Sequence, residues 1–500
     1  MENEPLTPRP VKEPSYADAI IPAVTLIVLI AGAVFLFGLD ALDGAVQVAL
    51  LFSATITTLI ILKNGHSWDE IVQAGQRSLA SITRPVFILL SIGALIGTWN
   101  MSGTIPTMVY YGIHLLHPSY FYVATLLICT VISLSIGSSW TTAGTIGVGL
   151  VGLASMVGVS PAITAGAVVS GSYVGDKISP LSETTVLTAQ LVQVDIYTHI
   201  RAMLWTTIPS LLVSVVVFTI LSLHEGTLVH DVDTVSELNK LNQLFRITPW
   251  NLLPLAALLV LSYRKVAPSL AIIFSALLAG IMAIFLQPQV VLNVVSGSDF
   301  STPLLFVKGI WQVMANGYHI STGIKEIDHL LSRGGMSSML NTLWIIIGAV
   351  TFGTLLEEFN LLTKLIQPIL RGARTTGRLI AFVVFTALGL NIIAADQYIA
   401  LVLPARLFRA EFDKRGLKPQ NLSRACADAG TVTSPLVPWN SCGAYMAAAL
   451  SVPTMQYLPF AIFNITAPLM SLVLGFTGFQ IQRIEPEQAQ AQTAPTAPTA

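Results

Sequence analysis

PVFILLSIGALIGTWNMSGTIPTMVYYGIHLLHPSYFYVATLLICTVISLSIGSSWTTAGTIGVGLVGLASMVGVSPAITAGAVVSGSYVG, residues 85–175, contains no aspartate, glutamate, lysine or arginine. One membrane-spanning helix needs about 20 mostly apolar residues, so this stretch alone is long enough for several crossings. A second charge-free run covers residues 429–482. Only 10% of the chain is charged, against about 25% in ordinary soluble proteins. These features indicate a protein that crosses the membrane many times.

Shorter uncharged runs supply further candidate spans. Because lipid cannot satisfy open backbone groups, each span must be a helix. We therefore predict an all-α polytopic membrane protein with about 11 to 13 transmembrane or half-spanning helices. The shorter runs are residues 19–39, 44–62, 202–224, 247–263, 266–298, 334–356 and 379–395.

Several functional classes receive no support from the sequence. A net charge of −1 provides no basic field for nucleic acid. The three cysteines, Cys129, Cys426 and Cys442, have neither a disulfide-framework spacing nor a metal-binding spacing. No nucleophile elbow, phosphate loop or HExxH motif occurs. We expect neither an enzyme nor a bound cofactor.

Basic and acidic loops predict the orientation and the division of the chain. Lysine and arginine concentrate in residues 63–84, 264–265, 371–378 and 406–424, which we assign to the cytoplasmic side together with the N-terminus. The predicted segments are a polar tail (1–15), a first transmembrane repeat (16–224), an external acidic connection (225–246), a second repeat (247–482) with an external excursion near 287–334, and a disordered tail (483–500).

Two pairs of polar motifs recur in the two halves. GSSWTTAG at 137–144 precedes GSYVGDKISPLSETT at 171–185, and NIIAADQY at 391–398 precedes ADAGTVTSPLVPWNSCG at 427–443. The tripeptide Ser-Pro-Leu occurs in the second motif of each pair. Matching interruptions in two halves of a transporter point to a binding site near the bilayer midplane. We expect two inverted repeats with discontinuous helices.

The first-half motif predicts a cation site around Asp176. A carboxylate within an apolar run costs about 2.5–3.5 kcal/mol on insertion scales, so it needs a reason to be there. Pro180 breaks the helix and frees backbone carbonyls, and neighbouring side chains add oxygen ligands. The alternatives are an Asp176–Lys177 or Lys177–Glu183 pair that only stabilises a helix junction, or a cytoplasmic loop outside the bilayer. The predicted ligands are Asp176, Ser179, Ser182, Glu183, Thr184 and Thr185.

The second half supplies the counterpart carboxylates Asp396 and Asp428. We predict that Asn391, Thr433, Ser434 and Asn440 join them, although Asp396 could instead stabilise a helix kink and Asp428 could cap a helix. Na+ is predicted at Asp176, Asp396 and Asp428. Candidate lining residues, for which helix packing is the alternative role, are Ser138, Ser139, Thr141, Thr142 and Lys177.

A desolvated carboxylate can hold a proton or a sodium ion but not both favourably. Competition for one carboxylate gives obligatory exchange when the site opens to one side at a time. We therefore predict a secondary transporter that exchanges Na+, or also Li+, for H+.

At these motifs the chain resembles the NhaC-type sodium/proton antiporters. The resembling stretches are residues 137–149, 170–185, 390–408 and 428–445. The resemblance implies an inverted-repeat transporter, with Asp176, Ser179, Ser182, Thr184 and Thr185 forming one half of the site and Asp396, Asp428, Thr433, Ser434 and Asn440 the other. Family members commonly carry Asp where Glu183 stands and Asn where Val186 stands, which leaves the ion preference open.

The same resemblance covers relatives that exchange malate for lactate and others that carry amino acids. A sodium- or proton-coupled carrier for a small organic acid or amino acid is therefore the alternative function, because half-helix N-termini also attract carboxylates. We expect a multi-pass protein of the bacterial inner or plasma membrane that contacts lipid, inorganic ions and no nucleic acid. A homodimer is one option for the oligomeric state.

Overall fold

The computed structural model describes residues 11–228, 234–296, 300–372 and 374–484, and within these ranges every named regular element is helical. Nine helices in the described part of the chain are long and apolar enough to cross a membrane. This confirms the predicted all-α polytopic class. The nine spans contain α1 (Tyr16–Phe37), α2 (Ala45–Lys63), α4 (Thr83–Met101), α6 (Phe121–Ile136), α7 (Ser139–Thr142) with η3 (Ala143–Gly147) and α8 (Val148–Val157), α11 (Ile196–Leu228), α14 (Pro268–Leu286), α18 (Leu340–Glu358) and α20 (Thr376–Ile393).

Further helices are not among these nine spans. The pair α24 (Thr454–Tyr457) and η8 (Leu458–Phe460) joins α25 (Ile462–Thr477) with a bend of 55°. Two of these further helices, α9 (Pro161–Ile178) and α21 (Gln397–Lys414), have 18 residues each. The shorter ones include α13 (Leu253–Tyr263), α10 (Glu183–Leu191), α22 (Pro419–Cys426), η6 (Ala427–Thr431), η7 (Ser434–Leu436) and α23 (Ser441–Leu450). The remaining α-helices are α3 (Trp68–Ser81), α5 (Thr104–Leu115), α12 (Thr234–Leu244), α15 (Pro288–Val294), α16 (Thr302–Asn316), α17 (Lys325–Leu331) and α19 (Leu361–Arg371).

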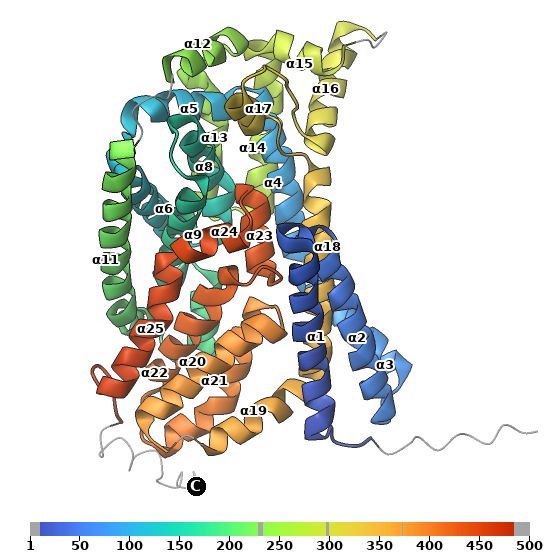
Figure 1. Ribbon diagram of the computed structural model, residues 1–500, viewed down its shortest axis with the longest axis vertical. Helices are drawn as coiled ribbons and strands as arrows, with labels where there is room; N and C mark the ends of the chain where they lie inside the picture. Colours follow the sequence, from blue (N-terminus) through green and yellow to red (C-terminus); the bar gives the residue numbers. More distant parts are fainter. Residues whose placement is uncertain (1–10, 229–233, 297–299, 373, 485–500) are drawn as a thin grey trace, which may run out of the picture.

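Lipid-facing helices can be recognised by apolar side chains on their outer surface. In α1, Leu26 and Ile30 are buried, whereas Val28, Phe35 and Leu36 are exposed. In water so much exposed apolar surface would be unfavourable, but hydrocarbon solvates it. In Figure 1, α1 stands beside α2 and α18 on one side of the molecule, and α11 stands on the other. Between them lie the interrupted helices.

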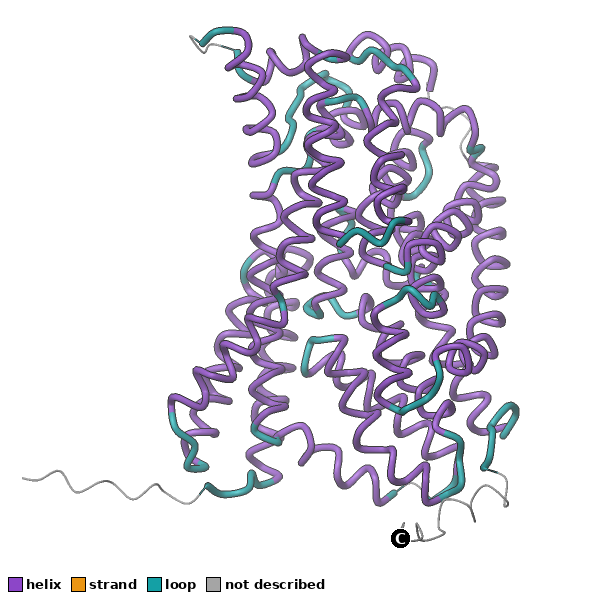
Figure 2. The backbone as a smooth tube through the Cα atoms, turned by 180° about the vertical axis from the view of Figure 1, so that it is seen from behind, coloured by secondary structure: helices purple, strands orange, loops and turns teal. Residues whose placement is uncertain are grey.

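The interruptions gather at mid-height. Figure 1 shows α8 and α23 in the upper half of the molecule and α21 in the lower half, and Figure 2 shows irregular backbone between such segments. Helix α6 ends before Gly137, α9 ends before Ser179, and α20 ends before Ala394. A fourth break precedes α23. These four breaks fall in the four polar motifs, so each sequence half contributes two. The inverted relation of the halves stays a prediction.

Close packing of α6 against α9 fixes the first-half breaks. A Cβ atom at Gly175 would collide with the backbone of Ser133 and Leu134, so only glycine fits there. The Ser133 hydroxyl donates to the Ser172 carbonyl at 2.5 Å. Tight contact through small residues is the usual way in which helices associate in lipid, where no hydrophobic force draws them together.

The predicted segment boundaries fall as follows on the structure. Helix α11 runs to Leu228, within the predicted connection 225–246, and α12 occupies most of the remainder. The predicted excursion 287–334 contains α15, α16 and α17, which lie at the top of Figure 1. Most of the two predicted polar tails, residues 1–10 and 485–500, lie outside the described residues.

Candidate functional site

The two breaks of the first half touch each other. Gly137 has a φ of +76°, and a Cβ atom there would lie 2.7 Å from the Cβ of Leu181 in the other break. Left-handed backbone and this close approach both require glycine. Ser138 then caps α7 by accepting from the Thr141 amide at 3.2 Å. The chain reversal thereby places Ser139 at the start of a buried half-helix.

Helix α9 ends because Pro180 cannot continue the hydrogen-bond ladder. The Ser179 hydroxyl donates to the carbonyl of Leu134 at 2.9 Å. The Thr185 hydroxyl of α10 lies 2.9 Å from the Asp176 carbonyl oxygen and 3.0 Å from the Lys177 carbonyl oxygen. Carbonyls at the end of a helix lack backbone partners, so this hydroxyl stabilises the end of α9.

Asp176 is surrounded by hydroxyl groups. Its side chain accepts from the hydroxyls of Ser139 and Ser182, each at 2.6 Å. Ser182 and Thr184 hydroxyl oxygens lie 2.9 Å apart. Asp176 is only 6% exposed, and no lysine, arginine or histidine in the described ranges forms an ion pair with it. The result is a buried carboxylate whose side-chain partners are hydroxyls.

The second half contains a comparable set of polar contacts. Asp396 caps α21 by accepting from the Ile399 amide at 3.0 Å, and it is buried. The Asn391 side chain donates to the Gly430 carbonyl at 2.8 Å and to the Thr433 hydroxyl at 3.0 Å. Asn440 in turn donates to the Asn391 side-chain oxygen at 3.1 Å. These bonds hold the break before α21 against the break before α23.

One polar chain connects the halves. The Gln397 side-chain oxygen accepts from Ser434 Oγ and Cys442 Sγ, each at 2.8 Å. Ser434 also lies 3.4 Å, oxygen to oxygen, from the hydroxyl of Tyr173 in α9. Since Gln397 follows Asp396 directly, this chain begins beside the second-half carboxylate and ends one helical turn from Asp176.

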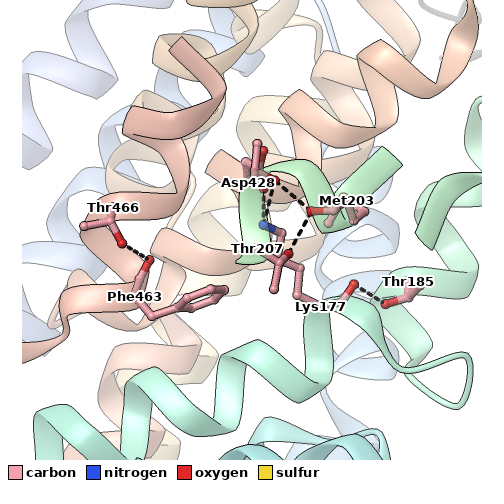
Figure 3. Close-up of polar contacts among 8 residues, drawn as sticks. Lys177, Thr185, Met203, Thr207, Asp428, Phe463 and Thr466 are labelled. Atoms are coloured by element: carbon pink, nitrogen blue, oxygen red, sulfur yellow. Dashed lines mark hydrogen bonds and ion pairs between the residues drawn. The ribbon is translucent and has the colours of Figure 1, made fainter. Parts of the chain in front are cut away.

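A buried ion pair forms the second connection between the halves. Lys177 Nζ contacts Asp428 Oδ1, and both side chains are fully buried. Thr206 of α11 lies beside the pair, because its hydroxyl is 3.0 Å from Lys177 Nζ and 3.0 Å from Asp428 Oδ1. The Phe463 ring lies 5.5 Å from Lys177 Nζ. Figure 3 shows Lys177 extending from α9 towards Asp428, beside α11 and Phe463.

The predicted site residues are therefore distributed unevenly. The structure brings Asp176, Ser139, Ser182 and Thr184 together and places Thr185 on the adjoining backbone. Asp428 is paired with Lys177, which differs from both sequence-based pairings considered for that lysine. Ser138, Thr141 and Thr142 make local bonds at the start of α7, and Ser179 bonds to α6.

Glu183 points away from this cluster. Its side chain is 60% exposed and its Oε1 lies 3.2 Å from Arg84 Nη1. The structure also shows Thr206, Tyr173 and Cys442 at the centre, which the sequence reasoning did not assign to the site. Their hydroxyl and thiol groups cost little in an apolar run, so hydropathy gives no signal for them. The described residues contain no group of three or more His, Cys, Asp or Glu arranged for a metal ion.

Comparison with known proteins shows which family of proteins has a similar sequence. The sequence profile of the Na+/H+ antiporter family matches residues 16–192 and 171–479. The Na(+)/H(+) antiporter NhaC of Alkalihalophilus pseudofirmus is 35% identical over 83% of this chain and 86% of its own length. The malate-2H(+)/Na(+)-lactate antiporter of Bacillus subtilis is 34% identical over 92% of this chain and 96% of its own length. The arginine/ornithine antiporter ArcD of Halobacterium salinarum is 33% identical over 98% and 97%.

Proposed function

Because the chain belongs to the Na+/H+ antiporter family, we propose that it is a secondary active transporter that exchanges Na+ for H+. Its many apolar helices make it a multi-pass integral membrane protein. Transport of this kind makes and breaks no covalent bond in the cargo, so we propose no enzymatic activity and no resident cofactor. Na+ and H+ are the substrates.

The single observation that carries the proposal is the environment of Asp176. Its carboxylate is buried and its side-chain partners are hydroxyls, at 2.6 Å from Ser139 and 2.6 Å from Ser182. Carboxylate and hydroxyl oxygens are suitable ligands for a hard cation such as Na+. A buried carboxylate without a basic partner is stabilised by either a proton or a cation. Na+ and H+ therefore compete for one group.

Asp428 has a different role in this proposal. Its carboxylate is neutralised by Lys177, so it needs neither a proton nor Na+ to be stable in the interior. We propose that this pair holds α9 against the second half while Asp176 exchanges its cargo. Asp396 keeps the proposed role of a second exchanging carboxylate, since it is buried and its side chain accepts a hydrogen bond from the Ile399 backbone amide.

The orientation follows from the basic loops. Arg406, Arg409, Lys414 and Arg415 lie in or directly after α21, at the bottom of Figure 1. Arg371 and Arg378 flank the loop between α19 and α20 at the same end. Positive residues favour the cytoplasmic side. We propose that this end and the N-terminal end of α1 face the cytoplasm of the inner or plasma membrane.

A carrier for a small organic acid or amino acid is the second candidate. Two relatives align over more than nine-tenths of this chain. One is named as a malate/lactate antiporter and the other as an arginine/ornithine antiporter. Lys177 would be the natural ligand for a substrate carboxylate, but its ammonium group is occupied by Asp428 and Thr206. This occupancy favours Na+/H+ exchange over anion binding in the conformation seen here.

Everted membrane vesicles test the two candidates. Vesicles containing the protein are acidified by respiration, and a pH-sensitive dye reports the collapse of the gradient when NaCl is added. We expect Na+ alone to cause the collapse, and Asp176→Asn to abolish it because an amide cannot exchange a proton for Na+. A collapse that requires malate, lactate, arginine or ornithine would replace the proposed function with the second candidate.

A matched control separates loss of exchange from loss of protein. Glu411 forms an ion pair with Arg415 at 2.8 Å near the end of α21, remote in sequence from each break. Glu411→Gln makes the same chemical change as Asp176→Asn and is expected to keep wild-type exchange. Membrane abundance of both variants is measured in parallel. Full exchange by an abundant Asp176→Asn variant would remove Asp176 from the transport site.

A further inference from the structure

An aromatic contact joins the first-half break to the second half of the protein. Trp140 of α7 stacks on Tyr445 of α23, with ring centroids 3.9 Å apart and an interplanar angle of 14°. The Tyr445 hydroxyl donates to the Trp140 carbonyl oxygen at 2.6 Å. Tyr445 is fully buried. Stacking and the hydrogen bond therefore act on the same residue, one through its side chain and one through its backbone.

The backbone of α7 and η3 is shaped to accept this contact. A Cβ atom at Gly144 would lie 2.5 Å from the Tyr445 hydroxyl oxygen, so glycine leaves the space that the hydroxyl needs. Residues 143–147 form a π-helical turn, an irregularity often found at functional sites. The Trp140 carbonyl thus receives the Tyr445 hydroxyl as well as the Ala143 amide.

The neighbour of Trp140 is a ligand of the proposed site. Ser139 directly precedes it in α7 and donates to Asp176 at 2.6 Å. A shift of the Trp140 peptide would therefore move Ser139 relative to the carboxylate. Charge-assisted bonds as short as this one depend steeply on distance and direction.

We propose that Tyr445 is a positioning residue for ion binding: through Trp140 it fixes Ser139 against Asp176 and thereby sets the affinity for Na+. This inference rests on the proposed function, since the affinity concerns the same site. No hydrogen bond joins Tyr445 to Asp176 in the described part of the chain, so Tyr445 acts through its ring and hydroxyl contacts with Trp140. The second half of the protein would then determine how well the first half holds its ion.

Two tyrosine variants test this role in the vesicle assay. Tyr445→Phe keeps the stacked ring and loses the hydroxyl, so we expect the apparent KM for Na+ to rise about five-fold, as for one lost hydrogen bond. The maximal rate should stay within about two-fold. Tyr122→Phe is the control, because Tyr122 is equally buried and its hydroxyl accepts from the Ser160 amide at 2.8 Å. That bond joins α6 to the residue before α9 and does not involve α7. The control should keep the wild-type KM.

Hydrogen–deuterium exchange decides the positioning claim without transport. In purified protein, peptides covering residues 138–147 should exchange about five-fold faster in Tyr445→Phe than in wild type, and at the wild-type rate in Tyr122→Phe. An unchanged exchange rate in Tyr445→Phe would make the contact incidental and overturn the proposal, and so would an unchanged KM for Na+. Wild-type vesicles without any Na+-driven proton movement would reject the proposed function, while the exchange comparison would still decide the role of Tyr445.

Discussion

Removing one member of the Lys177–Asp428 pair should destabilise the protein far more than removing both. The side chains are fully buried and in contact, and each also forms a hydrogen bond with the Thr206 hydroxyl. In Lys177→Met the Asp428 carboxylate stays buried without its ion-pair partner and keeps its hydrogen bond from the Thr206 hydroxyl. In Asp428→Asn the ammonium group of Lys177 likewise stays buried without its carboxylate partner.

The expected magnitude follows from this burial. Loss of one partner of a buried ion pair costs about 3–5 kcal/mol of unfolding free energy, because the remaining charge has neither water nor a counter-ion. The double variant Lys177→Met/Asp428→Asn leaves no charge at this place. We expect it to be more stable than either single variant by about 2 kcal/mol.

Equilibrium unfolding in mixed micelles with increasing SDS, followed by circular dichroism, measures these differences as a double-mutant cycle. The surface pair Arg84–Glu183 provides the control, since its side chains are 81% and 60% exposed. Its own cycle, Arg84→Met and Glu183→Gln, should give no measurable coupling. A double variant at Lys177 and Asp428 that is no more stable than the more stable of the two single variants would refute the reasoning.

Further outcomes concern the carboxylate site and the helix packing. Ser139→Ala and Ser182→Ala should each raise the apparent KM for Na+ about ten-fold in vesicles, because each removes a hydroxyl bonded to the Asp176 carboxylate; an unchanged KM in both would exclude the hydroxyls as ligands. Glu183→Gln should leave exchange intact, since the Glu183 side chain is exposed; a loss of exchange at normal abundance would return Glu183 to the site. Gly175→Ala should lower the yield of folded protein in fluorescence-detected size exclusion because the new methyl group meets the α6 backbone, whereas Gly389→Ala, with open space around it, should not.

The helical class and the positions of the breaks could be read from the sequence because they depend on local physical constraints. Charge-free runs of sufficient length require helices in lipid, and Pro180 interrupts a helix wherever it stands. Gly137 reflects a similarly local need, a left-handed turn. Each of these features leaves a mark within a few residues.

Contacts between distant segments leave no such mark. The partner of Lys177 lies in the other half of the chain, and the sequence offered two nearer acids, Asp176 and Glu183. Glu183 and Thr184 are adjacent, yet Ser182 caps α10 so that Glu183 is exposed and Thr184 is buried. Which side chains of the first helical turn are buried depends on how the helix is capped and on what packs against it. Amino-acid composition does not reveal either. Whether the predicted residues bind Na+ stays a prediction.

Asp176 and Lys177 are consecutive, and their Cα atoms are thus about 3.8 Å apart. The first side chain faces hydroxyls of its own half, and the second faces a carboxylate of the opposite half. The last turn of α9 therefore makes two contacts from adjacent residues, one with each half of the chain. A rotation of this turn that moves Asp176 away from Ser139 also displaces Lys177 from Asp428. If Asp176 exchanges its ion as proposed, the exchange therefore changes a contact with the other half of the chain directly.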